Sequence, residues 1–326
     1  MVKVNKVKLK KFFLGKNGQD GFLYKLFIYI LLIGISFIFL YPLLKMTAKS
    51  LMTLEDLVDS TKNWIPSKPT LKNYTTSIRV LNFSKAIKDS FFVALVPTAA
   101  CLISSALIGY GFACFDFPLK KIFFAILVLM FLVPNILTNI PTYVKYNQLG
   151  MLRSIKAYLY PALTGFGLRQ TVFILIFYQF FRVIPKELFE AAEVDGASVF
   201  KIFFTIAIPM SSVAFLICGL YSFVWYWNET SLALSYFSGK YQTLAMAVSN
   251  FRSRFYELFP SGDSLNDSFN EGIIFAGTML SIIPLLIIYL FTQKWFIESN
   301  FSAILSSYLS GVRCVLFRTT ETILTC

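Results

Sequence analysis

Long apolar segments separated by polar connections make up most of this chain. The six apolar segments cover roughly residues 27–44, 91–114, 122–143, 157–180, 212–234 and 273–293. Each falls within the roughly 17–25 residues that a helix needs to cross a hydrocarbon core about 30 Å thick. The pattern therefore predicts an all-α, polytopic membrane protein with six transmembrane helices.

A polar interlude at residues 184–209 separates the fourth and fifth apolar segments. Pro185 suits the first position of a helix, and Glu187 would lie in its first turn, where an acid is favourable. Gly196 can take the left-handed conformation that ends a helix, and Ser198 can cap the next one. Apolar residues then recur at helical spacing: Val199, Phe200, Phe203, Phe204 and Ala207. The interlude is expected to be a surface hairpin of two short helices that another protein can bind.

Composition and charge support a membrane protein and suggest its orientation. The 326 residues are 56% hydrophobic and 14% charged, with a mean hydropathy of +0.66 and a net charge of +13. Seven lysines precede the first apolar segment, which indicates a cytoplasmic amino terminus. The apolar run of about 18 residues is longer than that of a secretory signal and no A-x-A site follows it, so an uncleaved signal anchor is expected. Six spans then place both termini and the interlude in the cytoplasm. The connection 45–89 carries eight Lys or Arg against four acids, which counts against this orientation.

Few residues of the chain suit catalysis or metal binding. It has no histidine, and its five cysteines form no C-x-x-C pair, so the sequence predicts no metal site, cofactor or disulfide framework. It contains no G-x-x-x-x-G-K-[ST] motif and is not expected to hydrolyse ATP by itself. Charges inside the spans are limited to Arg169 and Glu229, which favours an energy source outside the chain. A secondary transporter or channel remains the alternative.

The interlude closely matches a known motif. Glu190-Ala191-Ala192, three residues, Gly196, nine residues and then Ile206-x-Ile208-Pro209 resembles the EAA loop of ABC-importer permeases, with Ile208 in place of Leu. Three shorter segments resemble the carbohydrate-uptake, maltose-type branch: Pro69-Thr70-Leu71-Lys72-Asn73-Tyr74, Asp89-Ser90 and Trp227-Asn228-Glu229. The chain departs from that branch at Cys114, where a basic residue is usual, and in its tail from Asn300.

The resemblance implies a type I ABC-importer permease subunit in the bacterial cell (inner or plasma) membrane. Such a subunit pairs with a second, usually different, permease and works with two ATPase subunits and an extracytoplasmic solute-binding protein. The solute implied is a sugar or oligosaccharide, and a permease for a non-sugar solute is the rival within the family. The residues implied to dock the ATPase are Glu190, Ala191, Ala192, Asp195, Gly196 and Pro209.

Several residues within the spans have two interpretations. Trp227, Asn228 and Glu229 are candidates for the substrate path, although Trp225, Tyr226 and Trp227 also fit an interfacial aromatic belt. Arg169 lines an aqueous path or lies nearer the membrane edge. Ser105, Gly109 and Ala113 form a small-residue stripe that favours close helix packing.

These assignments give four segments. They are a basic cytoplasmic segment, 1–26; the first span with its extracytoplasmic loop, 27–90; a permease core with the interlude at 184–209, 91–293; and a carboxyl-terminal tail, 294–326.

Overall fold

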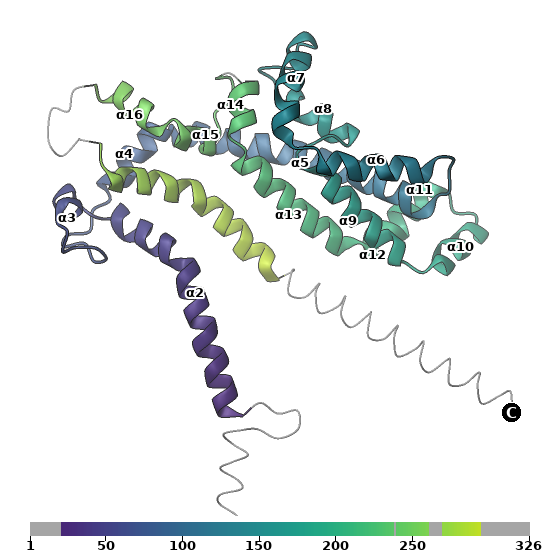
Figure 1. Ribbon diagram of the computed structural model, residues 1–326, viewed down its shortest axis with the longest axis horizontal. Coiled ribbons are helices and arrows are strands. Elements are labelled where there is room, and N and C mark those ends of the chain that lie inside the picture. Colours follow the sequence, from purple (N-terminus) through teal and green to yellow (C-terminus); the bar gives the residue numbers. More distant parts are fainter. Residues whose placement is uncertain (1–20, 238, 261–268, 295–326) are drawn as a thin grey trace, which may run out of the picture. The chain divides into compact units, whose positions relative to one another are not determined.

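The structure, a computed structural model, describes residues 21–237, 239–260 and 269–294. The lysine-rich start and the tail after residue 294 lie outside the described residues. All regular elements in the described part are helices (Figure 1). The described residues divide into two compact units, one within 1–77 and 259–279 and one within 78–258 and 280–326.

The first unit contains the amino-terminal helices. They are α2 (Phe22–Ser50), α3 (Leu54–Val58), the beginning of α4 (Lys72–Leu81) and the beginning of the helix Glu271–Lys294. The buried amide of Asn73 donates hydrogen bonds to the carbonyl oxygens of Ser50 (2.9 Å) and Met52 (2.8 Å). The last carbonyls of a helix have no partner within it, so Asn73 satisfies the end of α2. This contact gives the Asn-Tyr part of the sugar-branch motif a structural role.

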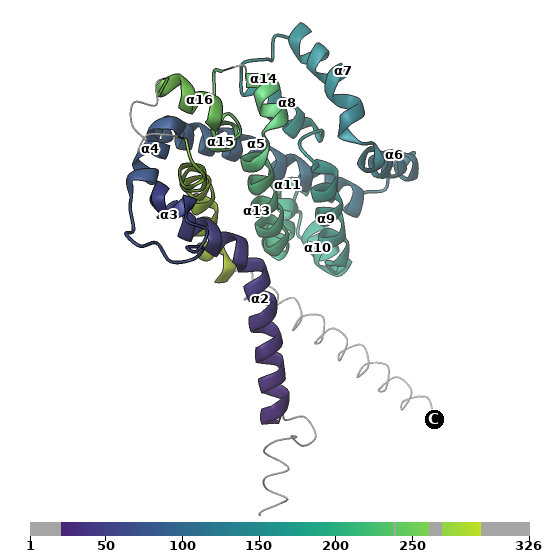
Figure 2. The same ribbon diagram turned by 60° about the vertical axis from the view of Figure 1, so that its left-hand side comes forward.

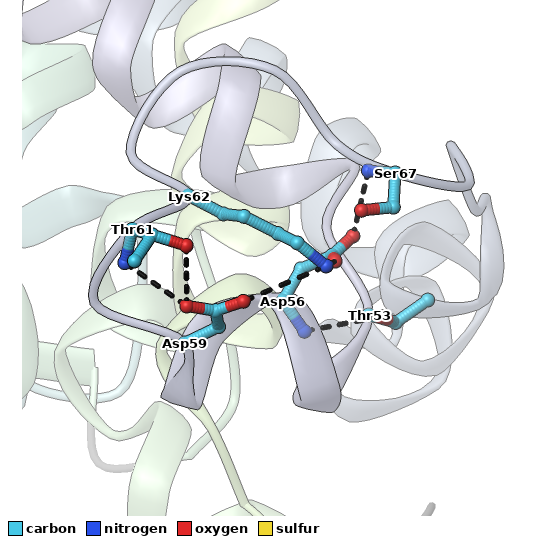
Figure 3. Close-up of polar contacts among 6 residues, drawn as sticks. All are labelled: Thr53, Asp56, Asp59, Thr61, Lys62 and Ser67. Carbon is cyan, nitrogen blue, oxygen red and sulfur yellow. Dashed lines mark hydrogen bonds and ion pairs between the residues drawn. The ribbon is translucent and has the colours of Figure 1, made fainter.

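A buried carboxylate organises the loop that follows α3 (Figure 3). Asp56 is 2% exposed, and its Oδ1 lies 2.9 Å from the Lys62 Nζ while its Oδ2 accepts the Ser67 N–H at 2.9 Å. The Thr53 hydroxyl caps the same helix by accepting the Asp56 N–H. These partners, first of all Lys62, lower the pKa of Asp56 to about 2 from an ordinary value of 3.8. The loop is therefore held by a carboxylate that is ionised at physiological pH.

The second unit is built around one long helix, α5 (Phe83–Cys114). The other elements are α6 (Lys120–Leu132), α7 (Asn135–Gln148), α8 (Lys156–Thr164), α9 (Gln170–Val183), α10 (Lys186–Val194), α11 (Val199–Ile202), the π-helical segment η1 (Phe203–Ala207), α12 (Ile208–Met210), α13 (Ser212–Asn228), α14 (Ser231–Phe237), α15 (Leu244–Ser249) and α16 (Phe251–Leu258). Helix α5 packs chiefly against α9, α13 and α8. Helix α10 follows one end of α9 and α8 precedes the other, so these two lie at opposite ends of it (Figures 1 and 2).

The contact of α5 with α9 depends on a glycine. A Cβ added to Gly109 would lie 2.7 Å from the Phe177 Cβ and 2.9 Å from the Tyr178 backbone nitrogen. The two backbones therefore approach too closely for any side chain at residue 109. The predicted packing role of the small-residue stripe is confirmed at Gly109.

Only some of the predicted spans are single helices. Among the described residues, α2, α5 and the helix Glu271–Lys294 are each long and apolar enough to cross a membrane. Counting each of two bent helix pairs as one span raises the number to five. The predicted span 122–143 is one such pair, α6 and α7, bent by 102°. Pro134, at this bend, cannot donate the backbone hydrogen bond of a continuous helix.

The predicted fourth span, 157–180, is two helices rather than one. Helix α8 ends at Thr164 and is followed by Gly165, which has a φ of +87°; α9 begins after Arg169, which has a φ of +50°. Left-handed residues interrupt the right-handed helical path, so the helix cannot run through 165–169. The predicted fifth span, 212–234, begins at Ser212 as expected, and α13 ends at Asn228. The total of six spans stays a prediction, whereas the prediction that the third and fourth are continuous helices is wrong.

Candidate coupling hairpin and solute cavity

The interlude at 184–209 folds as a helical hairpin. Helix α10 ends at Val194, and two residues later Gly196 has a φ of +76°, the left-handed conformation predicted for it. Its N–H donates to the Glu193 carbonyl oxygen, and the Ala197 N–H donates to the Ala192 carbonyl oxygen, each at 2.9 Å. These two bonds form a Schellman motif, the common helix end that glycine favours. The predicted stop of the first helix is confirmed.

The second arm begins where the sequence predicts. The Ser198 hydroxyl accepts the Lys201 N–H at 3.4 Å and caps α11. The helical path then continues through η1 and α12 and bends by 77° before α13. Its apolar residues do not share one buried face: Ile202, Phe203 and Ala207 are buried, whereas Val199, Phe200 and Phe204 are exposed.

Aromatic rings join the base of the hairpin to the helices of the core. The Tyr110 ring, near the end of α5, has its centroid 5.0 Å from that of Phe203 and 5.5 Å from that of Phe181. It also lies 6.3 Å from the ring of Phe189 on α10. Such pairs stabilise a contact beyond the area they bury. Both arms of the hairpin thus contact the same ring near the end of α5.

The tip of the hairpin is open to solvent. Glu190, Ala191, Asp195 and Gly196 are exposed, as is Pro209 on the second arm, and Ala192 is half-buried. Two apolar side chains of the hairpin are also exposed, Val194 by 87% and Phe200 by 69%. The predicted docking residues thus lie on an accessible surface that combines acidic and apolar groups.

The predicted substrate-path residues lie at the end of α13. Trp227 is 1% exposed, and its ring lies 5.2 Å from that of Phe91 and 5.5 Å from that of Phe223. Asn228 is exposed, and the Glu229 Oε1 accepts the Leu232 N–H at 2.9 Å. None of the three lines the cavities described next. Trp227 acts in packing, and Glu229 helps to begin α14.

A cavity opens where the predicted third and fourth spans are broken. It has a volume of about 910 Å³ and is bounded by residues of α6, α7, α8 and α9. An adjoining cavity of about 130 Å³ lies against α7, α8, the loop 165–169 and α14. The two share Arg169, which favours the aqueous-path interpretation of this residue. Besides Arg169, the polar side chains that line one or both cavities are Thr138, Asn139, Thr142, Lys145, Tyr146, Tyr158, Tyr160, Thr164, Gln170, Thr171, Tyr226 and Tyr236.

A buried glutamine fixes the loop that carries Arg169. The side chain of Gln170 is 1% exposed, and its Nε2 donates to the Ser104 hydroxyl (2.6 Å) and to the Ala162 carbonyl oxygen (2.9 Å). Its Oε1 accepts the Gly167 N–H at 2.7 Å. One amide therefore ties α5, α8 and the loop together, in keeping with the rule that buried polar groups are paired. This role was not predictable from sequence, because a single Gln beside an apolar helix has no distinctive spacing.

Asp89 and Ser90, one of the short segments that resemble the carbohydrate-uptake branch, hold the loop before α15. The Asp89 Oδ2 accepts the Gln242 N–H at 2.9 Å, and the Ser90 hydroxyl accepts the Leu244 N–H at 2.7 Å. Both residues belong to α5 and hold the start of α15. Asp89-Ser90 is thus a structural motif, recognisable in sequence because both backbone donors need an acceptor at a fixed position.

The fold combines apolar helices long enough to cross a membrane with a cavity bounded by α6, α7, α8 and α9 and with a hairpin exposed at its tip. This combination defines a membrane transport permease. The fold agrees with a solved structure, the crystal structure of a bacterial ABC transporter involved in the import of the acidic polysaccharide alginate. The TM-score is 0.70 at 20% identity, over 84% of this chain and 96% of that chain.

The chain belongs to the family of binding-protein-dependent transport system inner membrane components, whose profile matches residues 105–300. It is 30% identical over 258 residues to a putative ABC transporter permease protein, ORF2, of Caldicellulosiruptor sp., which covers 79% of this chain and 88% of that protein. It is 25% identical to the arabinooligosaccharides transport system permease protein AraQ of Halalkalibacterium halodurans, over 81% of this chain and 90% of AraQ.

Proposed function

We propose that this chain is a permease subunit that imports a sugar or oligosaccharide and is driven by a separate ATPase. The single observation that carries the proposal is the hairpin of α10 and α11, which is packed on the core at its base and exposed at its tip. A surface of this kind receives motion from a bound partner and passes it to the helices that surround the solute.

The proposed docking residues are Glu190, Ala191, Ala192, Asp195, Gly196 and Pro209. Alanines allow another protein to approach the helix closely, and the exposed carboxylates suit a basic partner surface. The exposed Val194 and Phe200 supply apolar area of the kind found at interface centres. We therefore place two ATPase subunits, one for each of two permeases, on the cytoplasmic side of the importer.

The choice of a carbohydrate rests on sequence similarity. The match to AraQ and the segments around Asn73 and Trp227 both point to the carbohydrate branch. The remaining parts of the proposal are six spans with both termini in the cytoplasm, a second and different permease, and an extracytoplasmic solute-binding protein. The basic amino-terminal segment supports the orientation.

The test uses cells that carry the complete importer, with this chain deleted and then restored. Restoration is expected to return uptake of at least one labelled sugar, and an ATPase subunit is expected to co-purify with the chain. Uptake should survive an uncoupler when ATP is held constant, because the spans offer an ion gradient few charges to act on. Loss of uptake under those conditions would establish a secondary transporter instead.

A further inference from the structure

We propose that the cavity beside Arg169 binds the anionic group of an acidic carbohydrate, a carboxylate, phosphate or sulfonate, on its way through the membrane. This inference rests on the proposed function and names the class of solute. Arg169 is its specificity-determining residue, and Lys145 adds a second positive charge to the same cavity.

The charges that line the cavities are all positive. Arg169 lines both adjoining cavities and Lys145 lines the larger one, whereas no Asp or Glu is among the described residues that line either. Within a membrane, an ionisable side chain that faces a cavity generally marks a solute or ion path. A guanidinium also matches the oxygens of carboxylates and phosphates in a bidentate geometry. The uncompensated charge therefore favours an anion over a neutral sugar.

Glu229 is the acidic residue to be weighed against this argument. Its Oε1 accepts the N–H of Leu232, a residue that lines the smaller cavity. The carboxylate is thus directed at the backbone of α14, where it begins a helix. Its negative charge offsets part of the positive field of Arg169 and Lys145. Among the described residues, however, it forms no ion pair with Arg169.

A buried hydroxyl in the smaller cavity has no partner. Tyr158 is 5% exposed and lines this cavity, and its Oη forms no hydrogen bond among the described residues. An unpaired buried hydroxyl costs free energy unless a ligand or water completes it. Its ring is fixed by Tyr226, 5.3 Å away, and by Phe237, 5.0 Å away. A solute oxygen between Tyr158 and Arg169 would satisfy the hydroxyl and the guanidinium together.

The position of Arg169 is set by its neighbours. Its guanidinium carbon lies 5.1 Å from the centre of the Trp225 ring, within the range of a cation–π contact. The next residue, Gln170, is tied to α5 and α8 as described above. These contacts hold the charge at the cavity wall before a solute arrives, and such preorganisation favours binding.

The experiment measures uptake by cells carrying the complete importer, with the chain supplied in wild-type or variant form. The labelled probes are digalacturonate, sn-glycerol 3-phosphate and sulfoquinovose as anions, and maltose and arabinotriose as neutral sugars. Arg169→Gln is expected to reduce uptake of an anionic probe by roughly tenfold or more, because a charge-assisted hydrogen bond is lost. Arg169→Lys should retain more uptake than Arg169→Gln. Tyr158→Phe should reduce uptake several-fold without reducing the abundance of the chain, since its hydroxyl supports no other group.

Arg153→Gln is the matched control. Arg153 is exposed and has a left-handed backbone, with a φ of +58°, yet it lines neither cavity. Uptake is expected to stay near the wild-type value. A loss of uptake equal to that of Arg169→Gln would mean that removing an arginine outside the cavities has the same effect. That result would overturn the assignment.

The other outcomes separate this inference from the proposed function. Two results would overturn the assignment to an anionic solute and leave the proposed sugar permease in place. One is that only neutral sugars depend on the chain for uptake; the other is that Arg169→Gln reduces the uptake of neutral and anionic probes equally. Lower abundance of Arg169→Gln with unchanged uptake per molecule would give the charge a structural role and would also overturn the assignment. If no probe depended on the chain, the proposed function itself would fail.

Discussion

The N–H of Ala197 lies 2.9 Å from the carbonyl oxygen of Ala192 and donates to it, which closes the end of α10 across the left-handed Gly196. The bond spans the segment that connects the two arms of the hairpin. The relative direction of α10 and α11 therefore depends on a left-handed backbone conformation. Glycine adopts it readily, whereas residues with a side chain adopt it only at a cost in free energy.

Gly196→Val is expected to release the ATPase and reduce uptake sharply, with the chain still inserted. No atom lies within 4 Å of a Cβ at this position, so the change causes strain rather than a clash. The strain is about 1–2 kcal/mol. Co-purification of the ATPase and uptake, both normalised to the abundance of the chain, measure the effect.

Lys201→Gln, on the exposed second arm, serves as the control and should leave both readouts unchanged. Ala192→Arg, which adds bulk where the partner is expected to approach, should resemble Gly196→Val. Normal ATPase retention in both hairpin variants would show that the segment 184–209 does not dock the ATPase.

The orientation of the chain is tested by labelling. In a background without native cysteines, a cysteine at Lys72 should react with an impermeant thiol reagent added outside, whereas one at Lys201 should react only after permeabilisation. Both positions are exposed, so access from the correct side is sufficient for reaction. The background must remove Cys114, which is exposed. Equal labelling at the two positions in intact cells would contradict six spans with cytoplasmic termini.

The loop after α3 should depend on the charge of Asp56. Asp56→Asn at pH 7 is expected to speed hydrogen exchange at the Ser67 amide several-fold, because the ionised acceptor of that N–H is lost. Glu55→Gln, one residue earlier and exposed, should not. An unchanged exchange rate in Asp56→Asn would mean that the carboxylate does not hold the loop.

The same carboxylate gives a dependence on pH whose direction is fixed. The pKa of Asp56 is about 2 in the folded loop and 3.8 ordinarily, so its stabilising effect is complete above about pH 4. It is lost as the pH falls from about 4 to about 2. Protection of the Ser67 amide, corrected for the intrinsic exchange rate, should be constant from pH 5 to pH 8 and should decline only in the acidic range.

The hairpin was predictable from sequence because local rules determine it. Gly196 and Ser198 act through their own backbone and the next turn, and both behave as predicted. The breaks in the third and fourth spans were not predictable from hydropathy, because the residues around Pro134 and Arg169 keep the segments apolar on average. The packing role of Trp227 was also not predictable, because its neighbours Asn228 and Glu229 are polar. Its ring is buried against Phe91, a residue far away in the sequence.

Gly109→Ala should destabilise the core where α5 meets α9. The added Cβ would lie 2.9 Å from the Tyr178 backbone nitrogen, and a backbone atom cannot move aside as a side chain can. Overpacking of this kind costs about 1–3 kcal/mol. The measurement is the midpoint of thermal unfolding of the detergent-solubilised chain, together with its abundance in the membrane.

Gly111→Ala on the same helix is the matched control, since no atom lies within 4 Å of its added Cβ. That change should be neutral or slightly stabilising, because alanine favours a helix over glycine by about 1 kcal/mol. Equal midpoints for the two variants would show that α5 and α9 do not approach each other as closely in the membrane protein as this packing requires.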